Sequence, residues 1–366
     1  MQKAMHTTVE KVPADNPQVN ISAIKNAAVI IRNSGLVAVP TETVYGLGAN
    51  ALSSDAVKKI FDAKGRPQDN PLIVHIADMS DIERVAINIP PLAYILAEKF
   101  WPGALTMVLE KSADVPYETT AGLDSVAVRL PSHETMRLLI KESGTPIAAP
   151  SANSSGKPSA TEAGHVICDL SGKINMILDS GPCGLGIEST VIDLTVSPPC
   201  VLRPGSITLE QLKEVDCSIV AASTGSTAEI NNDEAPIAPK SPGVKYTHYS
   251  PKAELIVVCG DSSRIVAAIN ELLRQSNGKS NSKKIAILAS EENVGNYIYD
   301  EKSVQLFTVG SRENIASVAR ELFRVLRLCD ELGIELIYAE AYPQTGLGAS
   351  VMDRLIKAAG YNIMNA

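Results

Sequence analysis

The sequence is poor in aromatic residues and has no excess of positive charge. Only one of its 366 residues is Trp and four are Phe, and the formal net charge at pH 7 is −8. Single-stranded nucleic acids are bound by stacking aromatic side chains, and duplexes by broad basic surfaces. A general nucleic-acid surface of either kind is therefore not expected, and any site for an anion must be a local cluster of cations.

The sequence also lacks the patterns of zinc, disulfide and membrane proteins. Its six cysteines are scattered, with no Cys-x-x-Cys pair, which argues against a zinc ribbon and is typical of a protein kept in a reducing compartment. Residues 1–20 contain no apolar core of a signal peptide. No apolar run approaches the roughly 18 residues of a membrane span. We therefore expect a cytoplasmic protein without a membrane segment.

Two common phosphate-binding signatures are missing or incomplete. There is no Gly-x-x-x-x-Gly-Lys-[Ser/Thr] segment, which excludes a P-loop nucleoside triphosphatase. Residues 346–351, Gly-Leu-Gly-Ala-Ser-Val, approach a dinucleotide-binding turn, but Val351 stands where the third glycine belongs. A nicotinamide-dependent enzyme built on the C-terminal part of the chain is therefore a weak alternative.

Two short polar islands stand out within apolar sequence. The first is Lys64-Gly65-Arg66-Pro67, followed by Asn70, and the second is Pro150-Ser151-Ala152-Asn153. An arginine can bind two phosphate oxygens at once and a lysine acts as a point charge, so a Lys-x-Arg pair suits a multiply charged anion. The alternative is a solvated helix C-terminus, where cations are favoured by the helix dipole. From residue types alone the two interpretations are about equally good.

Other polar residues lie in strands or at their ends. Thr43 follows a predicted strand, Ser189 precedes one and Arg203 follows one, while His75 and Arg129 lie inside apolar strands. A lone histidine in such a strand is more often a core residue than a ligand. A buried arginine needs an anionic partner, which is either an internal carboxylate or the carboxylate of a ligand. The number of these positions favours one shared pocket.

The pattern of the whole chain predicts an α/β (α+β) protein with a mixed, twisted sheet and a smaller second domain. We predict a catalytic domain over residues 15–216, a linker over 217–252 that could serve as an active-site lid, and a Rossmann-like α/β domain over 253–366. The predicted helices are 22–34, 54–63, 91–100, 135–141, 161–170, 263–274, 312–330 and 349–359. The predicted strands are 36–39, 72–76, 106–109, 125–130, 147–149, 190–194, 200–202, 255–259, 284–289, 303–308 and 335–340. Residues 41–48 are predicted to form a loop.

Several motifs together resemble one known family. Residues 40–47, Pro-Thr-Glu-Thr-Val-Tyr-Gly-Leu, the two polar islands, and Glu188-Ser189-Thr190-Val191 occur in the order found in the YrdC-like threonylcarbamoyl-AMP synthases. Residues 241–251, Ser-Pro-Gly through His-Tyr-Ser-Pro, followed by a small α/β domain, are similar to the long form of that family. The resemblance implies a YrdC-like twisted sheet with a deep, locally basic cavity.

The resemblance also implies a reaction. The enzyme would be a nucleotidyltransferase that condenses L-threonine, bicarbonate and ATP to threonylcarbamoyl-AMP and pyrophosphate. Other proteins would then transfer the threonylcarbamoyl group to the tRNA adenosine next to the anticodon, and direct tRNA binding by this chain stays open. Mg²⁺ would accompany ATP, held by phosphates and water because the sequence shows no acidic metal cage.

Site residues follow from the resemblance position by position. The catalytic cations would be Lys64 and Arg66. The threonine contacts would be Thr43, His75, Arg129, the backbone at Ala149, and Ser189. The ATP contacts would be Lys64, Arg66, Asn70, Ser125, Ser151, Asn153, Ser159, Arg203 and Tyr249.

Two alternatives remain from the residues themselves. One is a nucleic-acid-binding module whose local cations hold RNA, which the acidic balance and the scarce aromatics disfavour. The other concerns the C-terminal domain, which could be a regulatory or scaffolding module, since nothing in its residues names a ligand.

Overall fold

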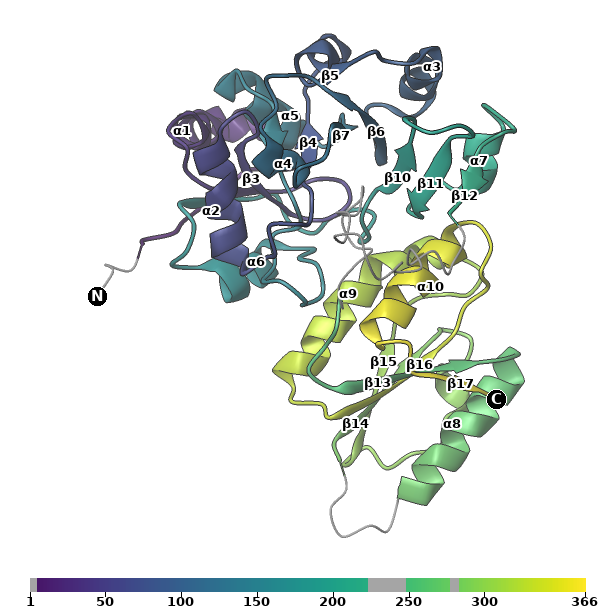
Figure 1. Ribbon diagram of the computed structural model, residues 1–366. Helices are drawn as coiled ribbons and strands as arrows, with labels where there is room; N and C mark the ends of the chain where they lie inside the picture. Colours follow the sequence, from purple (N-terminus) through teal and green to yellow (C-terminus); the bar gives the residue numbers. More distant parts are fainter. Residues whose placement is uncertain (1–4, 223–247, 277–282) are drawn as a thin grey trace, which may run out of the picture. The chain divides into compact units, whose positions relative to one another are not determined.

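The computed structural model describes residues 5–222, 248–276 and 283–366 (Figure 1). Most of the predicted linker, residues 223–247, lies outside the described residues, and so do Lys245 and Tyr246 of the motif at its end. Within the described part, the chain forms two compact units. Unit 1 draws on Met1–Ser155, Ala160–Gly184 and Glu188–Tyr246, and unit 2 on Gly156–Ser159, Leu185–Ile187 and Thr247–Ala366.

Unit 1 is built on a mixed twelve-stranded sheet. In spatial order its strands are β1 (Thr8–Lys11), β9 (Met176–Asp179), β2 (Val37–Val39), β3 (Gly46–Asn50), β8 (Ile147–Ala148), β4 (Ile73–His75), β7 (Ser125–Arg129), β6 (Leu105–Lys111), β10 (Thr190–Asp193), β11 (Cys200–Arg203) and β12 (Val220–Ala221), with β5 (Ala86–Ile87) paired to β6. Parallel and antiparallel pairs alternate irregularly along this order, as expected for a mixed sheet.

Helices surround the sheet of unit 1 and bury their apolar faces in its core. They are α1 (Ile21–Arg32), α2 (Ser54–Lys64), α3 (Pro91–Phe100), α4 (Tyr117–Thr120), α5 (Glu134–Ser143), α6 (Ala163–Leu170) and α7 (Leu209–Lys213), with 3₁₀ turns η1 (Pro17–Asn20) and η2 (Met79–Arg84). Helix α2 shows the local rules clearly. Its N-cap Ser53 accepts a hydrogen bond from the N–H of Ala56, and it ends at Gly65 in the left-handed conformation.

Unit 2 contains a five-stranded parallel sheet with helices on both faces. Its strand order is β15 (Val304–Thr308), β14 (Ile285–Ala289), β16 (Leu336–Glu340), β13 (Glu254–Cys259) and β17 (Ile363–Asn365). The helices are α8 (Ser262–Ser276), α9 (Ile315–Glu331) and α10 (Leu347–Ala358), with a 3₁₀ turn η3 (Val294–Asn296). Figure 1 shows α9 and α10 on one face of the sheet and α8 on the other. The chain moves in one direction across the sheet through α9 and α10, and in the opposite direction through α8. Because crossovers between parallel strands are right-handed, α8 lies on the face opposite to α9 and α10.

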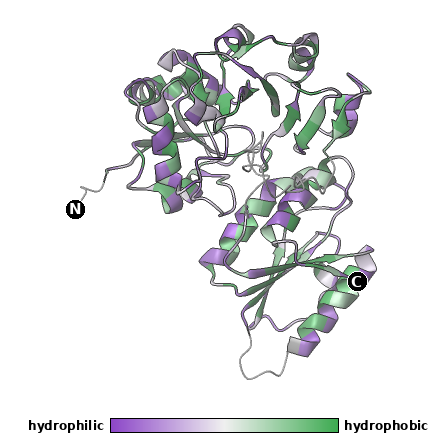
Figure 2. Cartoon of the chain, viewed as in Figure 1, coloured by the Kyte–Doolittle hydropathy of each residue, from purple (hydrophilic) through white to green (hydrophobic). Residues whose placement is uncertain are grey.

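Hydropathy follows this layering. Figure 2 shows strands that are mostly hydrophobic and helices in which hydrophobic and hydrophilic residues alternate. In α9 the apolar stripe includes Leu322 and Leu326, both buried. No helix among the described residues is both long and apolar enough to cross a bilayer.

The predicted fold class is confirmed, and most predicted elements lie within one to three residues of their observed bounds. One prediction was wrong: Gly46–Gly48 were assigned to a loop, but they form the first half of β3. Strands β1, β5, β9, β12 and β17 were not predicted, and β1 lies before residue 15, where the catalytic domain was expected to begin. Unit 2 also takes two short segments, 156–159 and 185–187, that fall within the range predicted for that domain.

Candidate active site

Lys64 joins the two polar islands. It is the last residue of α2 and is only 4 % exposed. Its Nζ donates to the carbonyl oxygens of Ser151 and Asn153, each at 2.5 Å. Its own carbonyl accepts from the N–H of Ser155 at 2.9 Å. Because the ammonium group is buried against the second island, a solvated helix end does not describe Lys64.

Arg66 follows the left-handed turn at Gly65 and folds back on the chain after it. Its Nη2 donates to the carbonyl oxygens of Asn70 at 3.3 Å and Pro71 at 3.2 Å. Asn70 is 1 % exposed, and its Oδ1 has no hydrogen-bond partner among the described residues. A buried polar atom without a partner is rare in folded proteins and marks a place where water or a ligand is expected.

Arg129 is the centre of a second buried cluster. It ends β7, is 3 % exposed, and donates from Nη1 to Thr43 Oγ1 at 2.9 Å and from Nε to the carbonyl of Gly103 at 3.2 Å. Its Nη2 lies 2.7 Å from Oε1 of Glu42. The internal ion pair that the sequence left open is therefore present. Glu42 was not among the predicted site residues, although a glutamate between two threonines directly after a buried strand is a usable signal.

The electrostatics of this cluster keep Glu42 charged and His75 neutral. Burial alone would raise the pKa of Glu42, but the charge and hydrogen bonding of Arg129 hold that pKa below its ordinary value. His75 is the register partner of Arg129 across β4 and β7. Burial, with the Arg129 charge adding to it, lowers the pKa of His75 to about 3. A neutral imidazole beside a guanidinium can serve a substrate hydroxyl, and its Nδ1 has no hydrogen-bond partner among the described residues.

Ser189 and Arg203 form a third group that is tied to the second. Ser189 Oγ lies 2.8 Å from Thr106 Oγ1, and Arg203 Nη2 donates to both the hydroxyl and the carbonyl of Ser189, at 3.2 and 3.0 Å. Residues 103 and 104 connect the two groups. The carbonyl of Gly103 accepts from Arg129, and the carbonyl of Ala104 accepts from the N–H of Thr190, the residue after Ser189. The backbone and side chain of Ser189 are thus fixed close to the Arg129 cluster.

Ala149 directly follows β8. Its N–H donates to the carbonyl of Ile73 at 3.0 Å. A Cβ added to Gly46 would lie 3.1 Å from the Cβ of Ala149, so the two chains approach closely here. The isolated bridge between Gly46 and Ser151 links the loop that carries Thr43 to the second polar island. The threonine and phosphate candidates of unit 1 therefore share one region.

Three further nucleotide contacts were predicted, Ser125, Ser159 and Tyr249. Ser125 begins β7 whereas Arg129 ends it, and four residues at about 3.3 Å each separate them by about 13 Å. Ser125 instead lines a pocket of about 370 Å³ that includes Asn88 and Glu110. Ser159 and Tyr249 belong to unit 2. The nucleotide role of these three residues remains a prediction.

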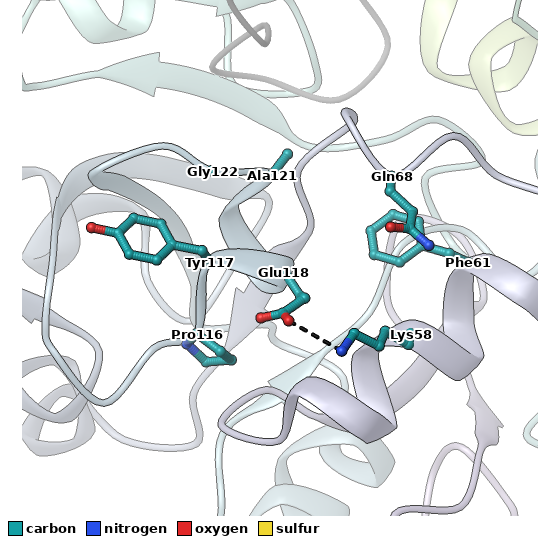
Figure 3. A pocket seen from close by; sticks show the side chains of 8 residues that line it. All are labelled: Lys58, Phe61, Gln68, Pro116, Tyr117, Glu118, Ala121 and Gly122. Carbon is teal, nitrogen blue, oxygen red and sulfur yellow. Dashed lines mark ion pairs between the residues drawn. The ribbon is translucent and has the colours of Figure 1, made fainter.

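A larger pocket, of about 560 Å³, contains none of the predicted residues (Figure 3). It is lined by Lys58, Phe61, Gln68, Pro116, Tyr117, Glu118, Ala121 and Gly122. Figure 3 shows Lys58 pointing toward Glu118, and their ion pair measures 3.3 Å. Both side chains are about one-third to one-half exposed, so this pair contributes little to stability. We assign no role in the reaction to this pocket.

Comparison with known proteins decides the family. Residues 29–205 match the Sua5/YciO/YrdC family model, described as "Telomere recombination", and residues 207–360 match the model described as "Threonylcarbamoyl-AMP synthase, C-terminal domain". A threonylcarbamoyl-AMP synthase of Pyrococcus abyssi is 49 % identical over 343 residues, which cover 93 % of this chain and 95 % of the relative. The chain belongs to the threonylcarbamoyl-AMP synthase family. The family and enzyme class expected from the motifs are thereby confirmed.

Other relatives agree over nearly the full length. The threonylcarbamoyl-AMP synthase of Bacillus subtilis is 46 % identical over 351 residues, covering 96 % of each chain. A crystal structure of P. abyssi Sua5 complexed with L-threonine matches with a TM-score of 0.89 and 46 % identity, covering 98 % of this chain and all of the other. These matches include the C-terminal domain, so the chain is similar to the long form of the family.

Proposed function

We propose that this enzyme condenses L-threonine, bicarbonate and ATP to threonylcarbamoyl-AMP, with release of pyrophosphate. The observation that carries the proposal is the convergence of Arg129, Thr43 and neutral His75 in one buried cluster of unit 1. A guanidinium suits the carboxylate of an amino acid, and a hydroxyl with an uncharged imidazole suits its side-chain hydroxyl. The threonine complex of the P. abyssi relative supports threonine as that amino acid.

The reaction has two steps. The threonine amine takes up the carbon of bicarbonate, forming a C–N bond and releasing water, to give a carbamate. A carbamate oxygen then attacks the α-phosphorus of ATP, and the bond to the β-phosphate oxygen breaks as pyrophosphate leaves. Every atom is provided by the three substrates, so the protein's contribution is to position the groups and to stabilise charge.

We assign Arg129 to the threonine carboxylate and Thr43, His75 and Ser189 to the remaining polar groups of threonine. Glu42 balances the charge of Arg129 and holds its guanidinium in place. We assign Lys64 and Arg66 to the phosphates, where they would offset charge that builds up at the α-phosphorus. Among the described residues, no three His, Cys, Asp or Glu side chains are grouped to hold a metal ion. We propose that Mg²⁺ accompanies ATP and is held by the phosphates and water, so that no step depends on a protein cage.

We further propose that the product serves tRNA modification by other proteins. The product is a mixed anhydride, which must be consumed by a transferase that accepts the threonylcarbamoyl group. The six cysteines are unpaired thiols, which supports our placing the enzyme in the reducing cytoplasm.

The test measures pyrophosphate release with and without threonine and bicarbonate. We expect release to need both, and to fall about 10²–10³-fold in Arg66→Ala, because such a loss follows removal of one charge stabiliser. Lys64→Met keeps the apolar stem of the buried side chain and should lose a similar factor. Lys58→Ala is the matched control, because Lys58 lies on the same helix but is about half exposed, and it should keep full activity. Threonine-independent release, or full activity of both cation variants, would overturn the proposal.

A further inference from the structure

Unit 2 includes two short segments that carry or adjoin residues of the proposed reaction. The first, residues 156–159, ends in Ser159, a proposed nucleotide contact. The second, residues 185–187, runs directly into Glu188 and Ser189. Neither segment contains a helix or strand, so their conformation depends on what they pack against. We call them the docked segments.

The docked segments contact one stripe of helix α9. Arg320, Phe323 and Arg327 are spaced i, i+3 and i+7, so they lie on one side of the helix. Arg327 is 6 % exposed and donates to the carbonyl of Pro158 from Nε at 3.1 Å and from Nη2 at 2.6 Å, with a longer bond from Nε to the carbonyl of Ser159 at 3.4 Å. These are charge-assisted bonds, which are about twice as strong as neutral ones.

The second docked segment touches the same stripe through its backbone. A Cβ added to Gly186 would lie 2.4 Å from the Cα of Arg320 and 2.5 Å from the carbonyl oxygen of Ala319. Gly186 also has a φ of +78°, which L side chains rarely adopt. Only glycine therefore allows this segment to lie directly on α9.

Tyr249 packs on Phe323, the middle residue of this stripe of α9. Its ring stacks on Phe323 with the centroids 5.0 Å apart and an interplanar angle of 29°, and the residue is 5 % exposed. Its φ is +66°, an unfavourable conformation for a bulky side chain that persists only where the surroundings fix it. The next residue, Ser250, donates its N–H to the carbonyl of Gly156 at 2.9 Å. The end of the linker and the first docked segment are thus fixed together on α9.

We propose that helix α9 positions the nucleotide contacts Ser159 and Tyr249, with Arg327 and Phe323 as the positioning residues. This inference rests on the proposed function, since it assumes that Ser159 and Tyr249 contact ATP. It gives the C-terminal domain a defined part in the reaction. A misplacement of about 1 Å of a positioned group can cost about 10²-fold in rate, so losing the bonds to the backbone at 158–159 should weaken the use of ATP. Ser189 is anchored separately by Thr106 and Arg203, so threonine binding should be spared.

The test compares Arg327→Met, Arg327→Lys and Phe323→Leu with the control Arg324→Met. Arg324 lies on the same helix but is exposed, and its ion pair with Glu321 is a local i,i+3 pair. We expect the KM for ATP to rise about ten-fold or more in Arg327→Met and Phe323→Leu, with the KM for threonine within about two-fold of wild type. Arg327→Lys should restore part of the loss, because a lysine can still donate to one carbonyl. The control should match wild type.

Hydrogen exchange gives a readout that does not depend on activity. Exchange in peptides covering residues 155–160 and 249–250 should speed up in Arg327→Met and stay unchanged in peptides from β6 and β7. If the KM values for ATP and threonine rise together, or neither rises, α9 has only a structural role and the inference fails. If wild type shows no threonine-dependent pyrophosphate release, the proposed function fails, while faster exchange at 155–160 would still show that Arg327 holds this segment. If Arg327→Met does not fold, Phe323→Leu alone decides.

Discussion

The Glu42–Arg129 pair places one full charge of each sign where little water reaches. Arg129 is 3 % exposed and the Glu42 side chain 16 % exposed. Taking both charges out of water is costly, and their mutual attraction offsets that cost only while both are present. Under the proposed function a threonine carboxylate adds a second anion beside the same guanidinium. Glu42 therefore fixes the orientation of the Arg129 guanidinium relative to the substrate.

Glu42→Gln should destabilise the protein by about 3 kcal/mol at pH 7, because it leaves a buried arginine unpaired. The pKa of Glu42 is lowered in the folded state. Its stabilisation is therefore complete above the ordinary glutamate pKa of about 4.3 and is lost as pH falls through the folded value. Urea unfolding at pH 7, 5 and 3.5 should show the difference from wild type shrinking only at the lowest pH.

The control for this measurement is Glu118→Gln. Glu118 pairs with Lys58 near the surface, where such a pair is worth at most about 1 kcal/mol. If the loss of unfolding free energy in Glu42→Gln stayed constant from pH 7 to 3.5, the loss would not come from the removed charge.

At the residue scale, the sequence could predict that Arg129 needs an anion but not which one. Residue types show that a guanidinium inside an apolar strand must be paired. The partner is chosen by the register of β4 and β7 and by the loop after β2, which brings Glu42 and Thr43 to it. Those long-range pairings leave no trace in local sequence. Likewise, the local sequence is compatible with a solvated Lys64, and only the bonds of its ammonium group to the carbonyls of residues 151 and 153 exclude that state.

At the scale of elements, the end of α2 decides where the two cations go. Gly65 has a φ of +62°, which ends the helix and separates Lys64, directed at the second polar island, from Arg66, directed at Asn70. A Cβ at Gly65 would meet nothing within 4 Å. A side chain at this position would therefore lower stability through the unfavourable backbone angle and not through a steric clash.

Gly65→Ala should lower stability by about 1–2 kcal/mol, the cost of placing an L residue in the left-handed region, and should also raise the KM for ATP several-fold by turning the two cations. Gly144→Ala is a matched control. Gly144 ends α5 with a φ of +69° and also has nothing within 4 Å of an added Cβ. Thermal unfolding should shift alike in both variants, whereas only Gly65→Ala should change the KM. Equal KM values would mean that the turn does not position the cations.

Elements with strong local signals were predictable, and those defined by distant pairing were not. Helix α3 was predicted with its observed bounds, Pro91–Phe100, and every helix predicted in the C-terminal domain is present. Strand β1, in contrast, is four residues long and exists because it pairs with β9, Thr8 opposite Met176. Gly46–Gly48 read as a loop because glycine favours turns, yet their pairing with β2 makes them a strand.

At the scale of the whole molecule, the two units are not separated by a single point in the sequence. Unit 2 takes residues 156–159 and 185–187 out of the sequence of unit 1. The single tryptophan, Trp101, lies in unit 1, is 9 % exposed, and donates from Nε1 to the carbonyl of Leu105 at 2.7 Å. Its fluorescence therefore reports on unit 1 alone, while far-UV circular dichroism reports on both units.

Leu326→Ala removes a fully buried side chain from α9 and should destabilise unit 2 by about 2–5 kcal/mol. We expect the part of the dichroism transition that belongs to unit 2 to have its midpoint at a lower urea concentration. The ATP-dependent activity should be lost at that same lower concentration, because unfolding of α9 releases residues 156–159. The Trp101 fluorescence transition should stay in place. Leu96→Ala, an equally buried change in α3 of unit 1, should shift the fluorescence transition instead. If Leu326→Ala moved the Trp101 transition as far as the dichroism signal, the two units would unfold as one cooperative body, and Ser159 would depend on the whole fold and not on α9.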